Sequence, residues 1–424
     1  MASDVQVRRV GDRISISIAL ELPEGTAMME CERAIQDALN EAGKLLTGEC
    51  LERFDTDGSP IEVGGINFTS KGRVGKAYQT PYGEVSVPRH VYQSGWGGAT
   101  YCPLDRSARV IESTTPRFAQ MCARKYATLN STLAQEDLAE CHQRHVSRCY
   151  LQDTAEAVAA IAQDKQPIWK YADAVEQTEV AFISLSIDGT CVLYCEEGWR
   201  TAMVGTLSLY DALGERLQTI YVGAPPAYGK ESFLEQMQRE IAIYKERYPG
   251  VLWVGVADGA KDYWPWLERF VHVQMLDFWH AVSYLETAAA AMHRSSKQRR
   301  AWFERSRHAL KHEHGAAEAL LEEMNEAARN PRLGSAARAH LQTAAGYFAN
   351  NLSRMNYAEA QARHWPLGSG VTEAACKTLV KQRMCGSGMK WKHDGAATVL
   401  SLRSLVLSTG RWQQFWSKIS RFGV

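Results

Sequence analysis

The chain has 424 residues, and its 48 lysines and arginines balance 48 aspartates and glutamates. A chain of this length can form two or three domains with substantial cores. Because the formal net charge is zero, any nucleic-acid binding must rest on local basic patches. No run approaches the ~18 apolar residues of a transmembrane helix. No secretory signal opens the sequence, so we expect a cytoplasmic protein without membrane contact.

Ten cysteines occur without a C-x-x-C pair, which argues against both a zinc ribbon and a disulfide framework. Reduced thiols are the default in the cytosol. Cys141, His145 and Cys149 recur every four residues, and on one helix they could ligate zinc. Three ligands from one helix rarely close a tetrahedron. We therefore expect no zinc.

Residues 1–112 predict a mixed α+β region. Residues 5–9 and 13–20 alternate like strands, and residues 25–54 have helical periodicity. The remainder is rich in glycine, proline and aromatic residues. That composition indicates short strands and turns, with a hairpin turn beginning at Pro81.

Residues 113–172 predict three helices. The first starts at Thr115-Pro116, the second at Ser131 and the third after Ser147. A short helix, a turn and a further helix fit a helix-turn-helix, although three-helix packing without a DNA role explains the pattern as well. The segment from Trp169 to Tyr171 reads as a linker.

From residue 180 the apolar period changes to two, which indicates strands. Three strands in hairpin order precede a helix at 230–247 and two further strands, and this order describes a mixed α/β sheet. The predicted strands are 180–187, 191–194, 202–210, 216–222, 251–257 and 271–276. Residues 285–365 are almost entirely helical and are predicted to form an insertion.

Three carboxylates from distant parts of this region suggest a site. Asp188 and Asp258 are predicted at the C-terminal ends of buried strands, and Glu373 near the start of a helix spanning 371–384. Such charges gather where ligands bind, and hard oxygen ligands suit Mg²⁺ or Mn²⁺. Two such ions about 3.5–4 Å apart can promote phosphoryl displacement. Each Asp-Gly could alternatively be a simple turn.

The helix that carries Glu373 is basic, and residues 374–392 contain no acid. Glu373, Lys377 and Lys381 recur every four residues and share one helical face. A carboxylate beside a ladder of cations suits a metal ion next to a polyanion, although an exposed helix with salt bridges is the alternative. The other basic residues of this stretch are Arg383, Lys390 and Lys392. A second basic stretch, residues 294–311, fits polyanion contact or a solvated face.

These motifs resemble those of the DDE transposases of bacterial insertion sequences, closest to the Kra group, over nearly the whole chain. The resemblance rests on Ile187-Asp-Gly-Thr, on Gly255-Val-Ala-Asp-Gly-Ala and on Asp277-Phe-Trp-His-Ala. Its most specific part is the block from Pro366 through Glu373 to Trp391. One departure is that residues 85–105, where many such enzymes carry a zinc ribbon, contain only Cys102.

The resemblance implies a ribonuclease-H-like catalytic domain with a triad of Asp188, Asp258 and Glu373 that holds two Mg²⁺ ions, for which Mn²⁺ would substitute. His280 would lie near the site, where it would support the reaction or simply pack under the sheet. Asp277 and Asp262 are the nearest rivals for a triad role, ranked lower because neither was expected to end an apolar strand. The residues expected to bind DNA are Lys377, Lys381, Arg383, Lys390, Lys392 and Arg148.

The resemblance also implies an activity and a domain order. The enzyme would bind the inverted repeats that end its element, cut one strand with water and join the exposed 3′-hydroxyl to target DNA. It would act as a homodimer or larger assembly on double-stranded DNA near the bacterial nucleoid. The alternatives are a nuclease or resolvase without strand transfer, and a transposase-derived DNA-binding protein without catalysis. The predicted domains are end contact in 1–112, helix-turn-helix in 113–172, catalysis in 173–284 with 366–424, and the insertion in 285–365.

Overall fold

The computed structural model describes residues 3–173, 175, 180–226, 229–260 and 262–423. The chain divides into two compact units, and the division falls at Trp169, inside the predicted linker. Unit 1 comprises Met1–Trp169 and Gln413–Val424, and unit 2 comprises Lys170–Trp412. Unit 1 therefore unites the two predicted N-terminal domains. It also takes the last residues of the chain, which we expected in the catalytic domain.

Unit 1 opens with a two-stranded antiparallel hairpin and a long helix, as the periodicity predicts. A four-stranded antiparallel sheet in the order β3-β4-β5-β6 follows. Its strands β4 and β5 are longer than the short strands expected, and they meet at the predicted turn after Thr80. The elements are β1 (Ser3–Val10), β2 (Arg13–Leu20), α1 (Met28–Glu52), β3 (Ile61–Val63), β4 (Ile66–Thr80), β5 (Gly83–Ser94), β6 (Gly97–Tyr101) and α2 (Pro103–Ser107).

Three helices complete this part of unit 1: α3 (Pro116–Thr128), α4 (Ser131–His142) and α5 (Arg148–Lys165). Their starts confirm the sequence prediction, and the Ser147 hydroxyl caps α5 by accepting from the Tyr150 N–H. The proposed spacing of Cys141, His145 and Cys149 on one helix is wrong. Helix α4 ends at His142, because Gln143 takes a left-handed conformation with φ of 51°.

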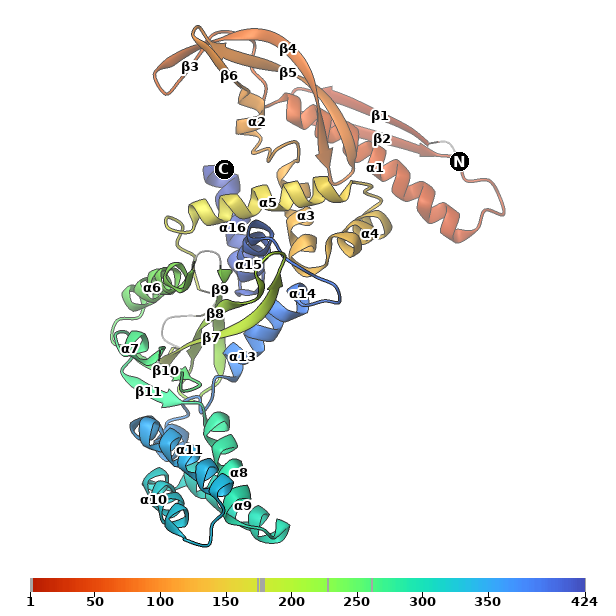
Figure 1. Cartoon of the computed structure of the whole chain (residues 1–424). Helices are drawn as coiled ribbons and strands as arrows, with labels where there is room; N and C mark the ends of the chain where they lie inside the picture. The colour runs from red at the N-terminus through yellow and green to blue at the C-terminus, as the bar shows by residue number, and fades with distance from the viewer. Residues whose placement is uncertain (1–2, 174, 176–179, 227–228, 261, 424) are drawn as a thin grey trace. The chain divides into compact units, whose positions relative to one another are not determined.

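Unit 2 is built on a five-stranded mixed sheet in the order β11-β10-β7-β8-β9. Strands β7, β8 and β9 are antiparallel neighbours, whereas β10 runs parallel to both β7 and β11. Figure 1 shows β7 and β8 as long strands of this sheet. The strands are β7 (Phe182–Tyr194), β8 (Gly198–Tyr210), β9 (Arg216–Ala224), β10 (Leu252–Ala257) and β11 (Val273–Leu276).

Strand β7 corrects one prediction, because it continues through Asp188 to Tyr194 without a turn at Asp188-Gly189. Its antiparallel pairing with β8 runs over the whole length, so the backbone at Asp188 stays hydrogen-bonded. A Cβ at Gly189 would lie 2.6 Å from the Thr201 side chain. Gly189 therefore permits close packing of β7 on β8 and does not mark the end of a strand.

Helices cover both faces of this sheet. Helix α6 (Gly229–Arg247) places Met237 against Gly205 of β8. The opposite face is covered by α15 (His393–Leu407), whose Leu400 packs against Gly223 of β9. Because apolar side chains fill both faces, Phe182 and Ile183, which lie on opposite faces of β7, are both buried. Each such side chain stabilises the fold by about 1.5–3 kcal/mol.

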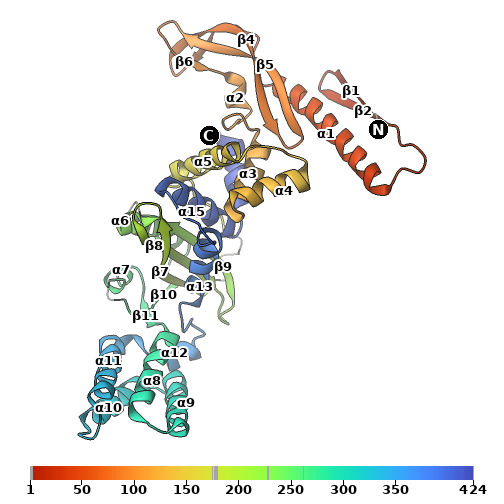
Figure 2. The same ribbon diagram turned by 45° about the vertical axis from the view of Figure 1, so that its right-hand side comes forward.

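Residues 278–362 are helical apart from short connections, which confirms the predicted helical content of the insertion. Helices α8, α9, α10 and α11 pack side by side (Figures 1 and 2). Their bounds are α8 (Phe278–Met292), α9 (Ser296–His312), α10 (Ala316–Arg329), α11 (Ser335–Asn351), η3 (Leu352–Arg354) and α12 (Tyr357–Ala362). A short helix, α7 (Trp264–Leu267), precedes β11.

The helix predicted at 371–384 exists but is not uniform. It consists of α13 (Gly370–Ala375), a π-helical segment η4 (Cys376–Lys381) and α14 (Gln382–Met384). π-Helical turns are frequent at functional sites. The last helix of the chain, α16 (Arg411–Phe422), crosses the boundary between the units. No described helix is long and apolar enough to cross a lipid bilayer.

Candidate active site

Three aspartates stand at equivalent positions on three adjacent parallel strands. Ser186 of β7, Val256 of β10 and Met275 of β11 are register partners. Exactly two residues after each partner comes an aspartate: Asp188, Asp258 and Asp277. Neighbouring strands lie about 4.8 Å apart, so the carboxyl edge of the parallel strands carries a row of three carboxylates.

Asp188 and Asp258 are half-buried in this row. One Asp188 oxygen accepts from the Cys376 thiol at 3.4 Å, so the π-helical segment η4 lies directly against it. Asp258 follows β10 as predicted, and its Oδ1 accepts from the Ala260 N–H at 3.0 Å. The other Asp188 oxygen, Oδ1, accepts from the Gly189 N–H at 2.6 Å, whereas Asp258 Oδ2 has no protein donor among the described residues. A carboxylate oxygen has two lone pairs, so an oxygen with one donor keeps room for another partner. Both carboxylates can therefore accept a further ligand.

Asp277 is fully buried and caps helix α8. Its Oδ1 accepts from the His280 N–H at 2.9 Å, and its Oδ2 accepts from the Ser369 N–H at 2.5 Å. Burial by itself would raise the pKa of Asp277, but the hydrogen bonds from His280 and Ser369 outweigh it and lower the pKa to about 2. The side chain is therefore a permanently ionised anchor at neutral pH.

Ser369 connects this anchor to Glu373. The Ser369 Oγ lies 2.8 Å from Asp277 Oδ2 and 3.0 Å from Glu373 Oε1. A hydroxyl has one proton and can donate to only one of the two carboxylates. Gly368 allows this approach, because a Cβ there would lie 2.8 Å from Asp277 Oδ2. The glycine-serine sequence thus brings the start of α13 against β11.

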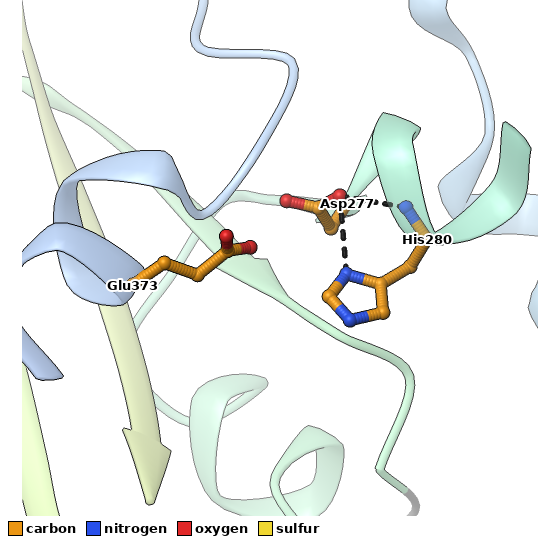
Figure 3. Close-up of side chains that lie close together, drawn as sticks. All are labelled: Asp277, His280 and Glu373. Atoms are coloured by element: carbon orange, nitrogen blue, oxygen red, sulfur yellow. Dashed lines mark hydrogen bonds and ion pairs between the residues drawn. The ribbon is translucent and has the colours of Figure 1, made fainter. Parts of the chain in front are cut away.

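Asp277, His280 and Glu373 form a cluster whose ligand atoms all lie within 4.8 Å of one another. Figure 3 shows the Glu373 carboxylate directed towards Asp277, and the His280 ring below the Asp277 carboxylate. His280 Nδ1 lies 3.2 Å from Asp277 Oδ1. This contact with Asp277 raises the pKa of His280, against the opposing effect of burial. The Asp258 and Glu373 charges raise it further.

The aspartate row and this cluster share one electrostatic environment. Burial, followed by the charges of Asp188 and Asp258, raises the pKa of Tyr263 to about 12. Burial, Asp188 and Glu373 raise the pKa of the Cys376 thiol. Tyr263 and Cys376 thus each respond to two of the predicted triad residues. The three predicted carboxylates therefore act on the same small region of unit 2.

The donor chemistry at this edge suits a hard divalent cation, since carboxylate oxygens are the ligands that Mg²⁺ and Mn²⁺ prefer. Asp277, His280 and Glu373 could hold a metal ion. The predicted ligand set differs from this group: within the part of the chain that the structure describes, Asp188, Asp258 and Glu373 do not form a group whose ligand atoms all lie within 4.8 Å of one another. Asp277 is also the member most fully engaged by N–H and O–H donors.

Asp277 was ranked below Asp258 because it was not expected to end an apolar strand, and this expectation is wrong. Strand β11 ends at Leu276, and Met275 and Leu276 are both buried, so Asp277 ends an apolar strand just as Asp258 does. The repeated pattern of an apolar strand followed by aspartate is visible in the sequence. Asp262, the other rival, has a side chain that is 87% exposed and lies 3.9 Å from Lys230. Ser369 was not among the candidate site residues, because a serine before a helix ordinarily indicates an N-cap.

The residues expected to bind DNA divide into two groups. Arg383 is only 4% exposed, and its guanidinium lies over the Trp391 ring at 5.1 Å, so it packs inside the protein instead of forming a DNA-facing surface. The others are exposed: Lys377, Lys381, Lys390, Lys392 and, in unit 1, Arg148. Trp412 and Trp416 are buried, in agreement with a role in the core.

No protein-family model matches the chain, and no curated protein matches it. Among solved structures it is similar to a Drosophila P element transposase strand transfer complex, at 10% sequence identity. The superposition covers 72% of this chain and 80% of that chain, with a TM-score of 0.24. So weak a likeness carries no argument, and the function has to be inferred from this chain's own residues.

Proposed function

We propose that the protein is a DNA transposase of the DDE type, similar to those of the Kra group of insertion sequences. The observation that carries the proposal is the row of carboxylates at one edge of the parallel strands, to which Ser369 connects Glu373. Carboxylates gathered in this way repel one another. A site that keeps them together is suited to binding cations.

The sheet supports assignment of unit 2 to the ribonuclease-H-like class. Three antiparallel strands come first in the chain, and two parallel strands then extend the sheet beyond β7. The first strand is therefore central, and it carries Asp188. The helical segment 285–365 separates this sheet from the helix of Glu373, which agrees with an insertion between the second and third carboxylates.

In this proposal Asp188, Asp258 and Glu373 would hold two Mg²⁺ ions, or Mn²⁺ in their place. Bound there, the ions would activate the attacking oxygen and stabilise the leaving oxygen of an in-line displacement. In the first displacement a water oxygen bonds to the phosphorus and the 3′-oxygen leaves, to become the 3′-hydroxyl. In the second, that hydroxyl attacks a phosphate of target DNA, whose own 3′-oxygen leaves.

The chain's other residues would position these groups. Asp277 Oδ1 lies 3.2 Å from His280 Nδ1 and so orients the ring. This leaves Nε2 to donate to a phosphate oxygen when the ring is protonated. Ser369 holds Glu373 in place through the contact at 3.0 Å. The protein itself forms no covalent bond to DNA, so catalysis is positioning combined with electrostatic stabilisation.

Unit 1 would provide contacts to the ends of the element. Residues 64–104 contain a single acid, Glu84, and the basic residues Lys71, Arg73, Lys76 and Arg89. At the turn between β5 and β6, Trp96 is 98% exposed. Lys71 and Arg73 are exposed, whereas Lys76 and Arg89 are half-buried beside Asp105. Exposed cations and an exposed aromatic ring suit a DNA backbone and its bases. Helices α3 to α5 would add a helix-turn-helix contact through Arg148, and a homodimer would pair two ends.

The proposal is tested with labelled duplexes that tile the DNA on both sides of the gene encoding the protein, in Mg²⁺ and in Mn²⁺. Wild type is compared with Asp188→Asn, Asp258→Asn and Glu373→Gln, which keep size and lose charge. Asp262→Asn serves as the matched exposed control. We expect wild type and the control to nick one duplex and join its 3′-end to a plasmid.

The three active-site variants should bind the same duplex without cutting it. Cutting without joining would favour the nuclease alternative. Binding with no metal-dependent chemistry in wild type would favour the non-catalytic DNA-binding alternative. Normal cleavage by the variants would show that the triad assignment is wrong.

A further inference from the structure

The four-stranded sheet of unit 1 ends in two glycine-containing turns that carry exposed apolar side chains (Figure 1). Between β3 and β4 the turn is Gly64-Gly65, and Ile66 directly after it is 52% exposed. Between β5 and β6 the turn is Gly95-Trp96, and the Trp96 side chain is 98% exposed. Phe68 of β4 pairs with Ser94 of β5. Because Ile66 and Trp96 each stand two residues beyond this pair, they lie at the same end of the sheet.

This apolar tip, Ile66 and Trp96, stands on an ordered backbone. Across the turn between β5 and β6, the Ser94 hydroxyl donates to the Gly97 carbonyl at 2.9 Å. Behind the turn, the rings of Phe68 and Tyr101 are in contact, with centroids 5.8 Å apart. The tip is therefore held in place although its side chains are exposed.

The space around the tip is open. A Cβ added at any glycine of the two turns would meet no atom of the described residues within 4 Å: these glycines are Gly64, Gly65, Gly95, Gly97 and Gly98. Larger side chains would fit at these positions without a clash in unit 1. The bare backbone makes the tip narrow, which suits insertion into a groove about 6 Å wide.

The strands behind the tip are polar and cationic. The exposed side chains of β4 include Asn67, Lys71 and Arg73, and β3 adds one exposed acid, Glu62. Arg73 lies 3.6 Å from Asp55, whereas no carboxylate of the described residues pairs with Lys71. A lipid surface would need a continuous apolar face. Amide donors and cations instead suit the phosphates and sugars of DNA.

We propose that the apolar tip inserts between two base pairs from the minor groove and kinks the duplex. Ile66 and Trp96 would form the wedge, and Lys71 would contact the phosphate backbone beside it. Apolar side chains inserted at a base step unstack it and bend DNA by about 20–90°. Pyrimidine–purine steps such as TA unstack most easily, so the tip would select sites by their deformability. The inference rests on the proposed function, since it requires unit 1 to bind DNA, and it adds that unit 1 deforms that DNA.

The test uses the full chain in buffer of low salt without divalent metal. The probe is a duplex of repeated TA steps that carries 2-aminopurine in place of adenine on one strand and a donor and an acceptor dye at its ends. Unstacking raises the 2-aminopurine fluorescence, and bending raises the energy transfer. We expect both signals to rise at saturating wild-type protein. Failure to bind the duplex, or binding without either rise, would overturn the proposal.

Substitutions at the tip separate a wedge from other contacts. Trp96→Ala should lose both rises, and Ile66→Ala should lose part of them. Trp96→Leu should keep both, because leucine also serves as a wedge. The matched control, Trp199→Ala, removes a ring that is 65% exposed in unit 2 and should keep both signals. Since Trp96 is exposed, its substitutions should leave the thermal midpoint of unfolding unchanged.

Three outcomes count against the wedge. Equal signals from Trp96→Ala and Trp199→Ala would show that Trp96 does not deform DNA. Loss of both signals in Trp96→Leu would show that the ring stacks on a base and does not act as a wedge. Binding to phosphatidylglycerol vesicles that depends on Trp96, with no change in the duplex signals, would assign the tip to a lipid surface.

No readout of this test requires cleavage. If wild type cannot cut any duplex but bends DNA through Trp96, the wedge stands and the transposase proposal fails. If wild type cuts and joins DNA while Trp96→Ala bends the probe as wild type does, the wedge proposal fails alone.

Discussion

The two larger sheets of this protein differ in how much of their surface is buried. The five-stranded sheet of unit 2 is covered on both faces, and its strand β7 buries every residue from Phe182 to Ile187. The four-stranded sheet of unit 1 leaves residues 71–75 of β4 all exposed. Its buried apolar cluster consists of Leu51, Tyr78, Val87, Leu104 and Val110.

This difference separates two physical tasks. Buried strands have a strictly specified register, because a slip of one residue would turn every apolar side chain outwards. That register aligns Asp188, Asp258 and Asp277 at one edge of unit 2. A surface that contacts a phosphate backbone needs exposed cations and tolerates a smaller core. The sheet of unit 1 has that character, with Lys71 and Trp96 both open to solvent.

The largest effect should come from the aspartate row. Asp188→Asn keeps the shape of the side chain and removes its charge, so cleavage should fall by about 10³-fold or more, equivalent to about 4 kcal/mol in the barrier. The measurement is the rate of nicking at saturating protein. The thermal midpoint and DNA affinity of the variant serve as controls. A fall in the nicking rate of less than tenfold, with both controls unchanged, would show that Asp188 is not part of the active site.

Asp277 should matter for stability even without DNA. Asp277→Ala leaves the N–H groups of His280 and Ser369 without their acceptor, at a cost of about 2–4 kcal/mol in the free energy of unfolding. Asp262→Ala, an exposed control, should change it by less than about 0.5 kcal/mol. Urea titration of the metal-free protein measures both.

The same comparison has a defined pH dependence. The pKa of Asp277 is lowered from 3.8 to about 2 in the folded protein, so the charged form contributes stability above pH 3.8 and loses it as the pH falls towards 2. The difference between wild type and Asp277→Ala should therefore shrink below pH 3.8. A difference that stays constant across this window would contradict the ionised anchor.

Variants in unit 1 should change the salt dependence of DNA binding and leave the rate of cleavage unchanged. Lys71→Ala removes one exposed cation, so DNA affinity should fall about threefold and the slope of log affinity against log salt should decrease by about 0.9. Lys44→Ala is the control, because Lys44 already pairs with Glu41 at 2.6 Å. Titrations by fluorescence anisotropy at several salt concentrations measure the slope. Identical salt slopes for the two variants would show that DNA does not contact Lys71.

The smallest effect should come from His280. Its pKa is raised by the contact with Asp277, so its stabilising contribution is fully present below pH 6.5 and is lost as the pH rises through the higher folded value. The His280 side chain is 43% exposed, which reduces the contribution to about 0.5 kcal/mol. His280→Gln should therefore destabilise the protein more at pH 6 than at pH 9. A larger loss at pH 9 would reverse the assigned direction.

Local patterns in the sequence were sufficient for most helices and strands. Alternation predicted β1 and β2, and Thr115-Pro116 and Ser147 marked the starts of α3 and α5. These signals depend on neighbours in the chain, so they can be read without knowledge of the fold. The same local reasoning failed at Asp188-Gly189. There the pairing with β8, a tertiary contact, keeps the strand extended.

The sequence by itself determined the candidate carboxylates and the basic helix, because aspartate after an apolar strand and lysines at helical spacing are local signals. Only the tertiary structure decided which groups meet. It aligned Asp277 with Asp188 and Asp258 through the register of three strands, connected Asp277 to Glu373 through Ser369, and buried Arg383 against Trp391. The physical reason is that the contacts around the carboxylates join residues far apart in the chain, 92 positions for Asp277 with Ser369 and 188 for Asp188 with Cys376, and only the packed sheet brings them within hydrogen-bonding distance.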